Sequence, residues 1–125
     1  MYIPLPTTLH EEWVGKAAAV GKHIICEKPL AVTAAEIKGM IDVCKSSNVL
    51  FMDGTMFMHL DRTKRVVEAK KQLGKIRKVV SSFCFCGDEN FHKNDIRTKK
   101  DCDALGALGD LGWYSVKVSM PSMHS

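Results

Sequence analysis

The chain has 125 residues, of which 46% are hydrophobic and 26% charged, as in an ordinary globular protein of one modest domain or parts of two. It contains no run of 18 apolar residues and no basic-then-apolar leader, so neither a transmembrane helix nor a signal peptide is expected. The net charge of +4 reflects a basic cluster at residues 61–78 without interleaved aromatic residues, which favours a solvated face over a nucleic-acid or membrane surface.

Two strands and one helix are predicted at the start of the chain. The opening apolar residues form a short strand that breaks on prolines, and the segment TLHEEWVGKAAAV then has the composition of a helix. Thr8 and Glu11 form a capping-box pattern at its start, and Gly21 stands where a helix C-cap belongs. The near-continuous apolar run HIICE follows, which indicates a strand covered on both faces.

The same order then repeats. Thr33 and Glu36 form a second capping-box pattern, Asn48 can close the helix, and VLFMDG follows as a third strand. One apolar stripe at helical spacing is formed by Ile37, Met40, Ile41 and Cys44. Alternating strands and helices predict βαβ units with a parallel sheet, whose functional loops lie at the carboxyl ends of the strands. Those ends are PLPTT, EKPL and DGTM.

The pattern changes after Gly54, so we place a domain boundary near residues 54–60. RTKRVVEAKKQLG predicts a surface helix with an apolar set of Val66, Val67, Ala69 and Leu73. KIRKVVSSFCFCG alternates between apolar and polar residues, which predicts a longer antiparallel strand with one packed face. A polar, irregular stretch leads to GALGDLGWYSVKVSM, which predicts a glycine-rich turn opening a helix.

The five cysteines are interpreted as reduced thiols. Their count is odd and no secretory signal favours disulfides, so we expect a reducing, cytoplasmic compartment. Cys84 and Cys86 lie on one face of a predicted strand, upstream of Asp88 and His92. Because no C-x-x-C pair anchors a zinc site there, we expect buried thiols and no metal.

Lys28 stands at the carboxyl end of the second predicted strand, where Pro29 restricts the backbone. An ammonium group held at this rim can polarise a carbonyl or stabilise an alkoxide, and Glu27 is a candidate partner for its charge. The alternative is a surface Lys–Glu pair in front of a turn, which contributes little free energy.

Asp110 and Tyr114 lie four residues apart, which places them on one face of a helix. A carboxylate that positions a substrate hydroxyl beside a phenol that exchanges a proton is plausible acid–base chemistry. The alternative is a helix start capped by Asp110 with a half-buried Tyr114. The glycines around them, spaced G-x-x-G-x-x-G, do not match the phosphate-binding fingerprint G-x-G-x-x-G.

Two further segments place side chains near the same rim. The prolines of YIPLPTTLH turn the chain outward, and His10 either reaches a ligand or lies exposed at the start of the next helix. Arg62, near the proposed boundary, is a candidate to face a substrate between domains, since a guanidinium suits a carboxylate or phosphate.

The ordered segments YIPLPTTLHEEW, GKHIICEKPLAVTAAE, DGTMFMHLDR and GALGDLGWY together resemble the Gfo/Idh/MocA family, most closely its plant-type members related to dihydrodiol and D-xylose dehydrogenases. The resemblance covers residues 1 to about 116. It implies an oxidoreductase that uses NAD or NADP and acts on a sugar, polyol or diol. By resemblance, Lys28 is the active-site lysine, Asp110 positions the substrate, and Tyr114 gives or takes the proton.

The resemblance also implies a cofactor site. Its members in this chain are Pro6, Thr7, His10, Glu27, Lys28 and Pro29, with the peptide before Pro29 cis as in relatives. The loop commonly reads T-P-N in the family and reads LPT here. No glycine-rich phosphate loop is present, so we expect weak or no binding of a dinucleotide by these 125 residues.

The expected fold is α/β. Residues 1–56 correspond to the second half of a Rossmann-type dinucleotide-binding domain with a parallel sheet, and residues 57–125 to the beginning of an α+β substrate domain with antiparallel strands. The chain is thus expected to be a fragment of the family's enzyme, whose substrate-domain sheet allows a homo-oligomer. The alternative is a non-catalytic, truncated product that associates with full-length relatives through exposed sheet edges.

Overall fold

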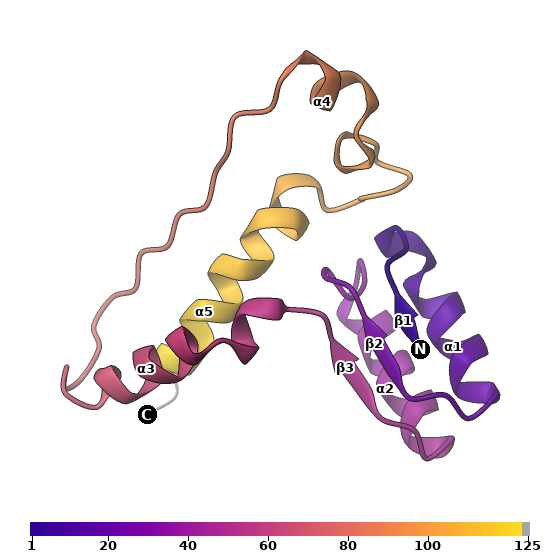
Figure 1. Ribbon diagram of the computed structural model, residues 1–125, viewed down its shortest axis with the longest axis horizontal. Helices are drawn as coiled ribbons and strands as arrows, with labels where there is room; N and C mark the ends of the chain where they lie inside the picture. The colour runs from indigo at the N-terminus through magenta and orange to yellow at the C-terminus, as the bar shows by residue number, and fades with distance from the viewer. Residues whose placement is uncertain (124–125) are drawn as a thin grey trace.

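The computed structural model describes residues 1–123, and its N-terminal part is a small parallel sheet with two connecting helices (Figure 1). The strands, in the spatial order β1-β2-β3, are Tyr2–Ile3, Ile24–Cys26 and Phe51–Asp53. Helix α1 (His10–Ala19) joins β1 to β2, and α2 (Ala34–Ser46) joins β2 to β3. Cys26 lies opposite Ile3 on one side and Asp53 on the other, so the strand ends are level. The predicted βαβ arrangement is confirmed.

The core lies on one face of this sheet only. Alternation along β2 directs Ile24 and Cys26 toward the helices, and both are buried. They join a cluster whose other main members are Ile3, Val14, Ala17, Ala18, Met40 and Cys44. Ile25, which points to the opposite face, is 40% exposed. The expectation that this strand is covered on both faces is wrong for the described residues, because both connecting helices pack on the same side.

The helix ends show why the two capping predictions had different outcomes. Thr33 caps α2, and its hydroxyl oxygen accepts a hydrogen bond from the Glu36 amide at 3.2 Å, as predicted. The Thr8–Glu11 box is wrong, because the chain enters α1 through a 3₁₀ turn, η1 (Thr7–Leu9), with Leu9 as the N-cap residue. The Thr8 hydroxyl donates instead to the carbonyl oxygen of Asp101 at 3.0 Å. Both helices close on left-handed residues, as predicted: Gly21 and Asn48.

The second half of the chain is mainly helical. It contains η2 (Met56–His59), α3 (Asp61–Lys70), α4 (Glu89–Asn94), η3 (Ile96–Thr98), a π-helical turn η4 (Leu108–Gly112) and α5 (Trp113–Met123). Helices α3 and α5 lie side by side, and the start of α5 approaches the carboxyl end of the sheet (Figure 1). No helix within residues 1–123 combines the length and apolar character needed to cross a bilayer.

The antiparallel strand predicted at KIRKVVSSFCFCG is not formed. Residues 75–87 run as an extended segment from α3 to α4 without a neighbouring strand in the described chain (Figure 1). The alternating pattern predicts an extended backbone, but a strand also needs ladder hydrogen bonds to a partner, and these are missing here. Cys84 and Cys86 are therefore exposed rather than buried as expected, whereas Cys26 and Cys44 are buried free thiols.

Candidate active site

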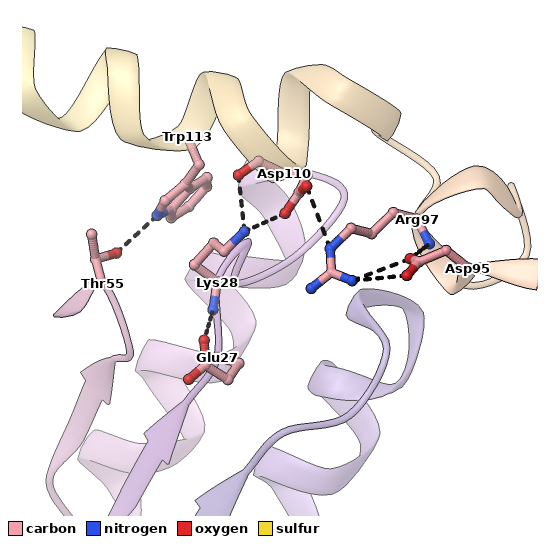
Figure 2. A network of polar contacts seen from close by, with 7 residues as sticks. All are labelled: Glu27, Lys28, Thr55, Asp95, Arg97, Asp110 and Trp113. Atoms are coloured by element: carbon pink, nitrogen blue, oxygen red, sulfur yellow. Dashed lines mark hydrogen bonds and ion pairs between the residues drawn. The ribbon is translucent and has the colours of Figure 1, made fainter. Parts of the chain in front are cut away.

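Lys28 lies at the carboxyl end of β2 and meets a carboxylate from the other half of the chain. Its Nζ donates to Asp110 Oδ1 at 2.5 Å and to the Asp110 carbonyl oxygen at 2.9 Å (Figure 2). The two side chains are only 12% and 11% exposed. The peptide bond between Lys28 and Pro29 is cis. The proposed partner Glu27 is not the one observed, because its carboxylate accepts instead from the Tyr2 hydroxyl at 2.7 Å and the Lys28 amide at 3.2 Å.

Asp110 reaches Lys28 because the π-helical turn η4 approaches the sheet closely. A Cβ atom on Gly109 would lie 3.3 Å from Pro29 Cγ and 2.6 Å from Leu105 Cβ, so only glycine fits at this crossing. Of the three glycines spaced G-x-x-G-x-x-G, Gly109 is the one that lies against the Lys28–Pro29 loop.

Tyr114 completes the group of three predicted catalytic residues. Lys28 Nζ lies 4.9 Å from the centroid of the Tyr114 ring, a cation–π distance. The ring is flanked by Phe57 and Phe83, with centroids at 5.9 and 5.6 Å. The structure thus brings the aromatic face of Tyr114 onto the Lys28 ammonium group.

A cavity of about 200 Å³ opens beside Lys28, between the strand ends and the second half of the chain. One wall is the loop Pro4–Thr7, the floor is Glu27–Pro29, and the opposite wall contains Arg97, Asp103 and Asp110. Every residue expected to bind the cofactor lines this cavity except His10. Among residues 1–123, no group of three or more His, Cys, Asp or Glu side chains is arranged to hold a metal ion.

Residues 1–55 match the family described as "Oxidoreductase family, NAD-binding Rossmann fold", GFO_IDH_MocA. The match covers the parallel sheet and both of its connecting helices. It is 37% identical over 95% of its length to the D-xylose 1-dehydrogenase (NADP(+)) 2 of Haloferax volcanii, and 36% identical over 94% to the levoglucosan dehydrogenase of Pseudarthrobacter phenanthrenivorans. These alignments cover 36% and 31% of the two relatives, so the chain spans about a third of their length.

Solved structures of Gfo/Idh/MocA oxidoreductases have the same fold. The aldose-aldose oxidoreductase of Caulobacter crescentus, complexed with glycerol, matches 98% of this chain and 36% of its own with a TM-score of 0.82 at 27% identity. The 3-ketoreductase KijD10 of Actinomadura kijaniata, in complex with NADP and TDP-benzene, matches 94% and 36% with a TM-score of 0.79 at 31% identity. A levoglucosan dehydrogenase in complex with NADH matches 96% and 33% with a TM-score of 0.72 at 35% identity.

His10, which the family resemblance places in the cofactor loop, does not line the cavity beside Lys28. Its ring is fully buried, and neither the ligand contact nor the exposed helix start describes it. Nε2 lies 2.8 Å from the Leu5 carbonyl oxygen and Nδ1 lies 3.0 Å from that of Leu30. His10 therefore connects the two loops that form the wall and floor of the cavity.

Arg62 is not brought to the Lys28–Asp110 pair. It lines a separate cavity of about 460 Å³ together with Tyr114, Phe57 and Phe83. This second cavity lies between η2, α5 and the extended segment, so Arg62 shares a site with the third predicted catalytic residue only.

Two charged residues of the site, Arg97 and Asp103, were not predicted from the sequence. Arg97, on η3, has its Nε 3.4 Å from Asp110 Oδ2. Asp103 is buried in the cavity wall, and its Oδ1 has no hydrogen-bond partner in the described chain. Burial raises the pKa of the Asp103 carboxyl, and the charge of Asp110 raises it further. Both residues lie in the polar stretch between α4 and η4, which has no periodicity that could have identified them.

A clamp between β3 and α5 holds this arrangement in place. Trp113 Nε1 donates to the buried Thr55 hydroxyl oxygen at 3.0 Å, and the Lys117 ammonium pairs with Asp53 (Figure 2 shows the first contact). Burial would raise the pKa of Asp53, but its bonds with Lys117 and Thr55 outweigh that effect and lower it. Because Asp110 lies just before Trp113, the clamp also fixes Asp110 above Lys28.

Proposed function

We propose that this chain supplies active-site residues of an NAD(P)-dependent oxidoreductase that acts on a sugar, polyol or diol. The observation that carries the proposal is the buried Lys28–Asp110 pair under the Tyr114 ring, at the carboxyl ends of parallel strands, where ligands of such sheets bind. The named activities of the relatives, on D-xylose and levoglucosan, support this substrate class.

The cavity beside Lys28 suits the nicotinamide end of the cofactor. Its walls combine the flat, apolar faces of Pro6 and Pro29 with the polar Thr7 and Lys28, and its volume of about 200 Å³ matches a small aromatic amide rather than a dinucleotide. When bound, the nicotinamide supplies or accepts the hydride. The pyrophosphate has no glycine-rich loop to bind within the 125 residues.

The remaining chemistry is assigned to side chains of this chain. Lys28 stabilises the negative charge on a substrate oxygen when its hydroxyl loses a proton, and Tyr114 donates or accepts that proton. Asp110 orients a neighbouring substrate hydroxyl and holds the Lys28 ammonium in place through their ion pair. Arg62, in the cavity next to Tyr114, binds the distal part of the substrate.

Binding of nicotinamide mononucleotide, which lacks the second nucleotide, tests this proposal. We expect saturable NMR shift changes at residues 4–7 and 27–30, with a Kd on the order of 1 mM for so small a ligand. Lys28→Met should weaken binding about tenfold, while Lys22→Met, at an exposed lysine outside the site, should not change it. Shift changes that never saturate, or that map elsewhere, would contradict the proposal.

The alternative role, a non-catalytic chain that associates with full-length relatives, is favoured by one specific observation. Residues 75–87 present an extended backbone that has no partner strand within residues 1–123, and the side chains of Val80 and Phe85 on it are 79% and 52% exposed. Sedimentation of the chain alone and mixed with a full-length relative tests this role and the expected homo-oligomer. A chain that sediments as a monomer in both samples would exclude both kinds of association.

A further inference from the structure

The carboxylate of Asp110 has a cation at each of its two oxygens, although the proposed chemistry uses only its contacts with Lys28 and with a substrate hydroxyl. Oδ1 accepts from the Lys28 ammonium, and Oδ2 faces Arg97 Nε at 3.4 Å from the opposite side (Figure 2). Arg97 comes from η3, thirteen residues before Asp110, so the second contact joins two separate loops.

Arg97 is itself anchored by a second carboxylate. Asp95 caps η3, and its Oδ1 accepts from the Arg97 amide at 3.0 Å and from Arg97 Nη1 at 3.1 Å. Burial lowers the pKa of Arg97, but its bonds to Asp95 and the charge of Asp110 outweigh this and raise it. The guanidinium is therefore charged and held in one orientation by its own turn.

The contact with Arg97 restricts the rotation of the Asp110 carboxylate, which binds Lys28 through its other oxygen. A carboxylate bound at one oxygen can rotate about its Cβ–Cγ bond, whereas cations on both oxygens define its plane. A planar guanidinium that is bound to Asp95 transfers its own orientation to Asp110, which a lysine at this position could not do.

We infer that Arg97 is a positioning residue for the Lys28–Asp110 pair, and that Asp95 in turn fixes Arg97. Its importance for catalysis rests on the proposed function, but the contact chain Asp95–Arg97–Asp110–Lys28 does not. Loss of Arg97 frees the Asp110 carboxylate, so the Lys28 ammonium spends more time without Oδ1, one of its two acceptors on Asp110, and exchanges its protons with water faster.

NMR of the Lys28 ammonium group in the full chain tests the inference without an activity assay. In Arg97→Ala we expect hydrogen exchange at Lys28 Nζ to rise about tenfold, the factor that corresponds to one charged hydrogen bond. Asp95→Asn, which keeps Arg97 charged but weakens its anchor, should give a smaller rise in the same direction. Arg65→Ala, at an exposed arginine on α3, is the matched control and should leave the rate unchanged.

Rescue experiments separate orientation from charge. Guanidinium ions should slow the exchange again in Arg97→Ala, whereas ammonium ions at the same concentration should not, and Arg97→Lys should restore it only in part. An unchanged Lys28 rate in both Arg97→Ala and Asp95→Asn overturns the inference, as does equal rescue by ammonium. If the wild-type chain shows the protected ammonium but no nicotinamide mononucleotide binding, the proposed function fails while the role of Arg97 stands.

Discussion

The buried carboxyl group of Asp103 makes the stability of the folded chain depend on pH. Asp103 lies in the cavity wall with Oδ1 unpartnered in the described chain, and the pKa of Asp103 is raised by burial and by Asp110, against a hydrogen bond from the Leu105 amide. A carboxyl whose pKa is raised by folding favours the folded state when it is protonated. Its contribution to stability is therefore complete below the ordinary aspartate pKa and is lost as the pH rises through the raised value.

Asp103→Asn should stabilise the fold at neutral pH. The amide keeps an acceptor for the Leu105 amide but carries no buried charge, so we expect the melting temperature at pH 7 to rise by a few degrees, about 1 kcal/mol. The gain should shrink as the pH falls through the raised pKa of Asp103 and vanish below the ordinary aspartate pKa of about 3.9, where the carboxyl is protonated in the folded and the unfolded state alike. Asp101→Asn, at an exposed carboxylate two residues earlier, is the control. A variant less stable than wild type at pH 7 would show that the buried charge is favourable.

At the scale of elements, the contacts between the end of β3 and α5 hold the two sides of the site together. Two contacts do this, the Trp113–Thr55 hydrogen bond and the Lys117–Asp53 ion pair. Thr55 has no exposed surface, and its hydrogen bond with the Trp113 indole N–H is part-buried, so water replaces this acceptor poorly.

Thr55→Val should measure how much the Trp113–Thr55 hydrogen bond contributes to the free energy of unfolding. It leaves the Trp113 N–H without an acceptor in a part-buried position, at an expected cost of about 1–2 kcal/mol in the free energy of unfolding. Trp113→Phe removes the donor but also packing volume. If the two groups interact, chemical denaturation of the double variant will show a loss smaller than the sum of the single losses. Strict additivity would mean that the hydrogen bond contributes nothing.

The Lys117–Asp53 ion pair leads to a prediction about unfolding in acid. Because folding lowers the pKa of Asp53, the carboxylate contributes stability above its ordinary pKa of about 3.9, and this is lost as the pH falls through the lowered value. Lys117→Met removes one cause of the lowering, so its acid-unfolding midpoint, followed by circular dichroism, should move to higher pH. Lys22→Met, at an exposed lysine near the end of α1, should leave the midpoint in place.

At the scale of the whole molecule, the site is formed by residues from both halves of the chain. The sheet supplies Lys28 and the loop Pro4–Thr7, while the helical half supplies Asp110, Tyr114 and Arg97. His10 connects parts of the first half, because its two ring nitrogens lie 2.8 and 3.0 Å from carbonyl oxygens in the loops that form the wall and the floor of the cavity. The cavity therefore depends on each half separately and on the clamp between them.

The residues that the two halves supply predict how tightly the chain binds complete dinucleotide cofactors. If the cavity beside Lys28 binds nicotinamide as proposed, the chain, which has no glycine-rich loop among its 125 residues, should bind NADH or NADPH no more than about tenfold more tightly than nicotinamide mononucleotide. Thermal-shift titrations with each compound measure this directly. A saturable rise in melting temperature at micromolar NADPH would show that another part of the chain binds the pyrophosphate.

The sequence alone determined the features that depend on near neighbours. The βαβ spacing, the caps at Thr33 and Gly21, and the place of Lys28 at a strand end all follow from residues within a few positions of one another. The four-residue spacing likewise placed Asp110 and Tyr114 on one side of a helical segment, although the local form is a π turn leading into α5.

Only the tertiary structure decided which distant groups meet. The partner of Lys28 is Asp110 rather than its neighbour Glu27, His10 is buried rather than facing a ligand, and Arg97 and Asp103 belong to the site. The extended segment at 75–87 has an alternating pattern but no strand beside it in the described chain. Local patterns report backbone preference and burial, whereas pairing depends on which elements cross, and that requires contacts between residues far apart in the chain.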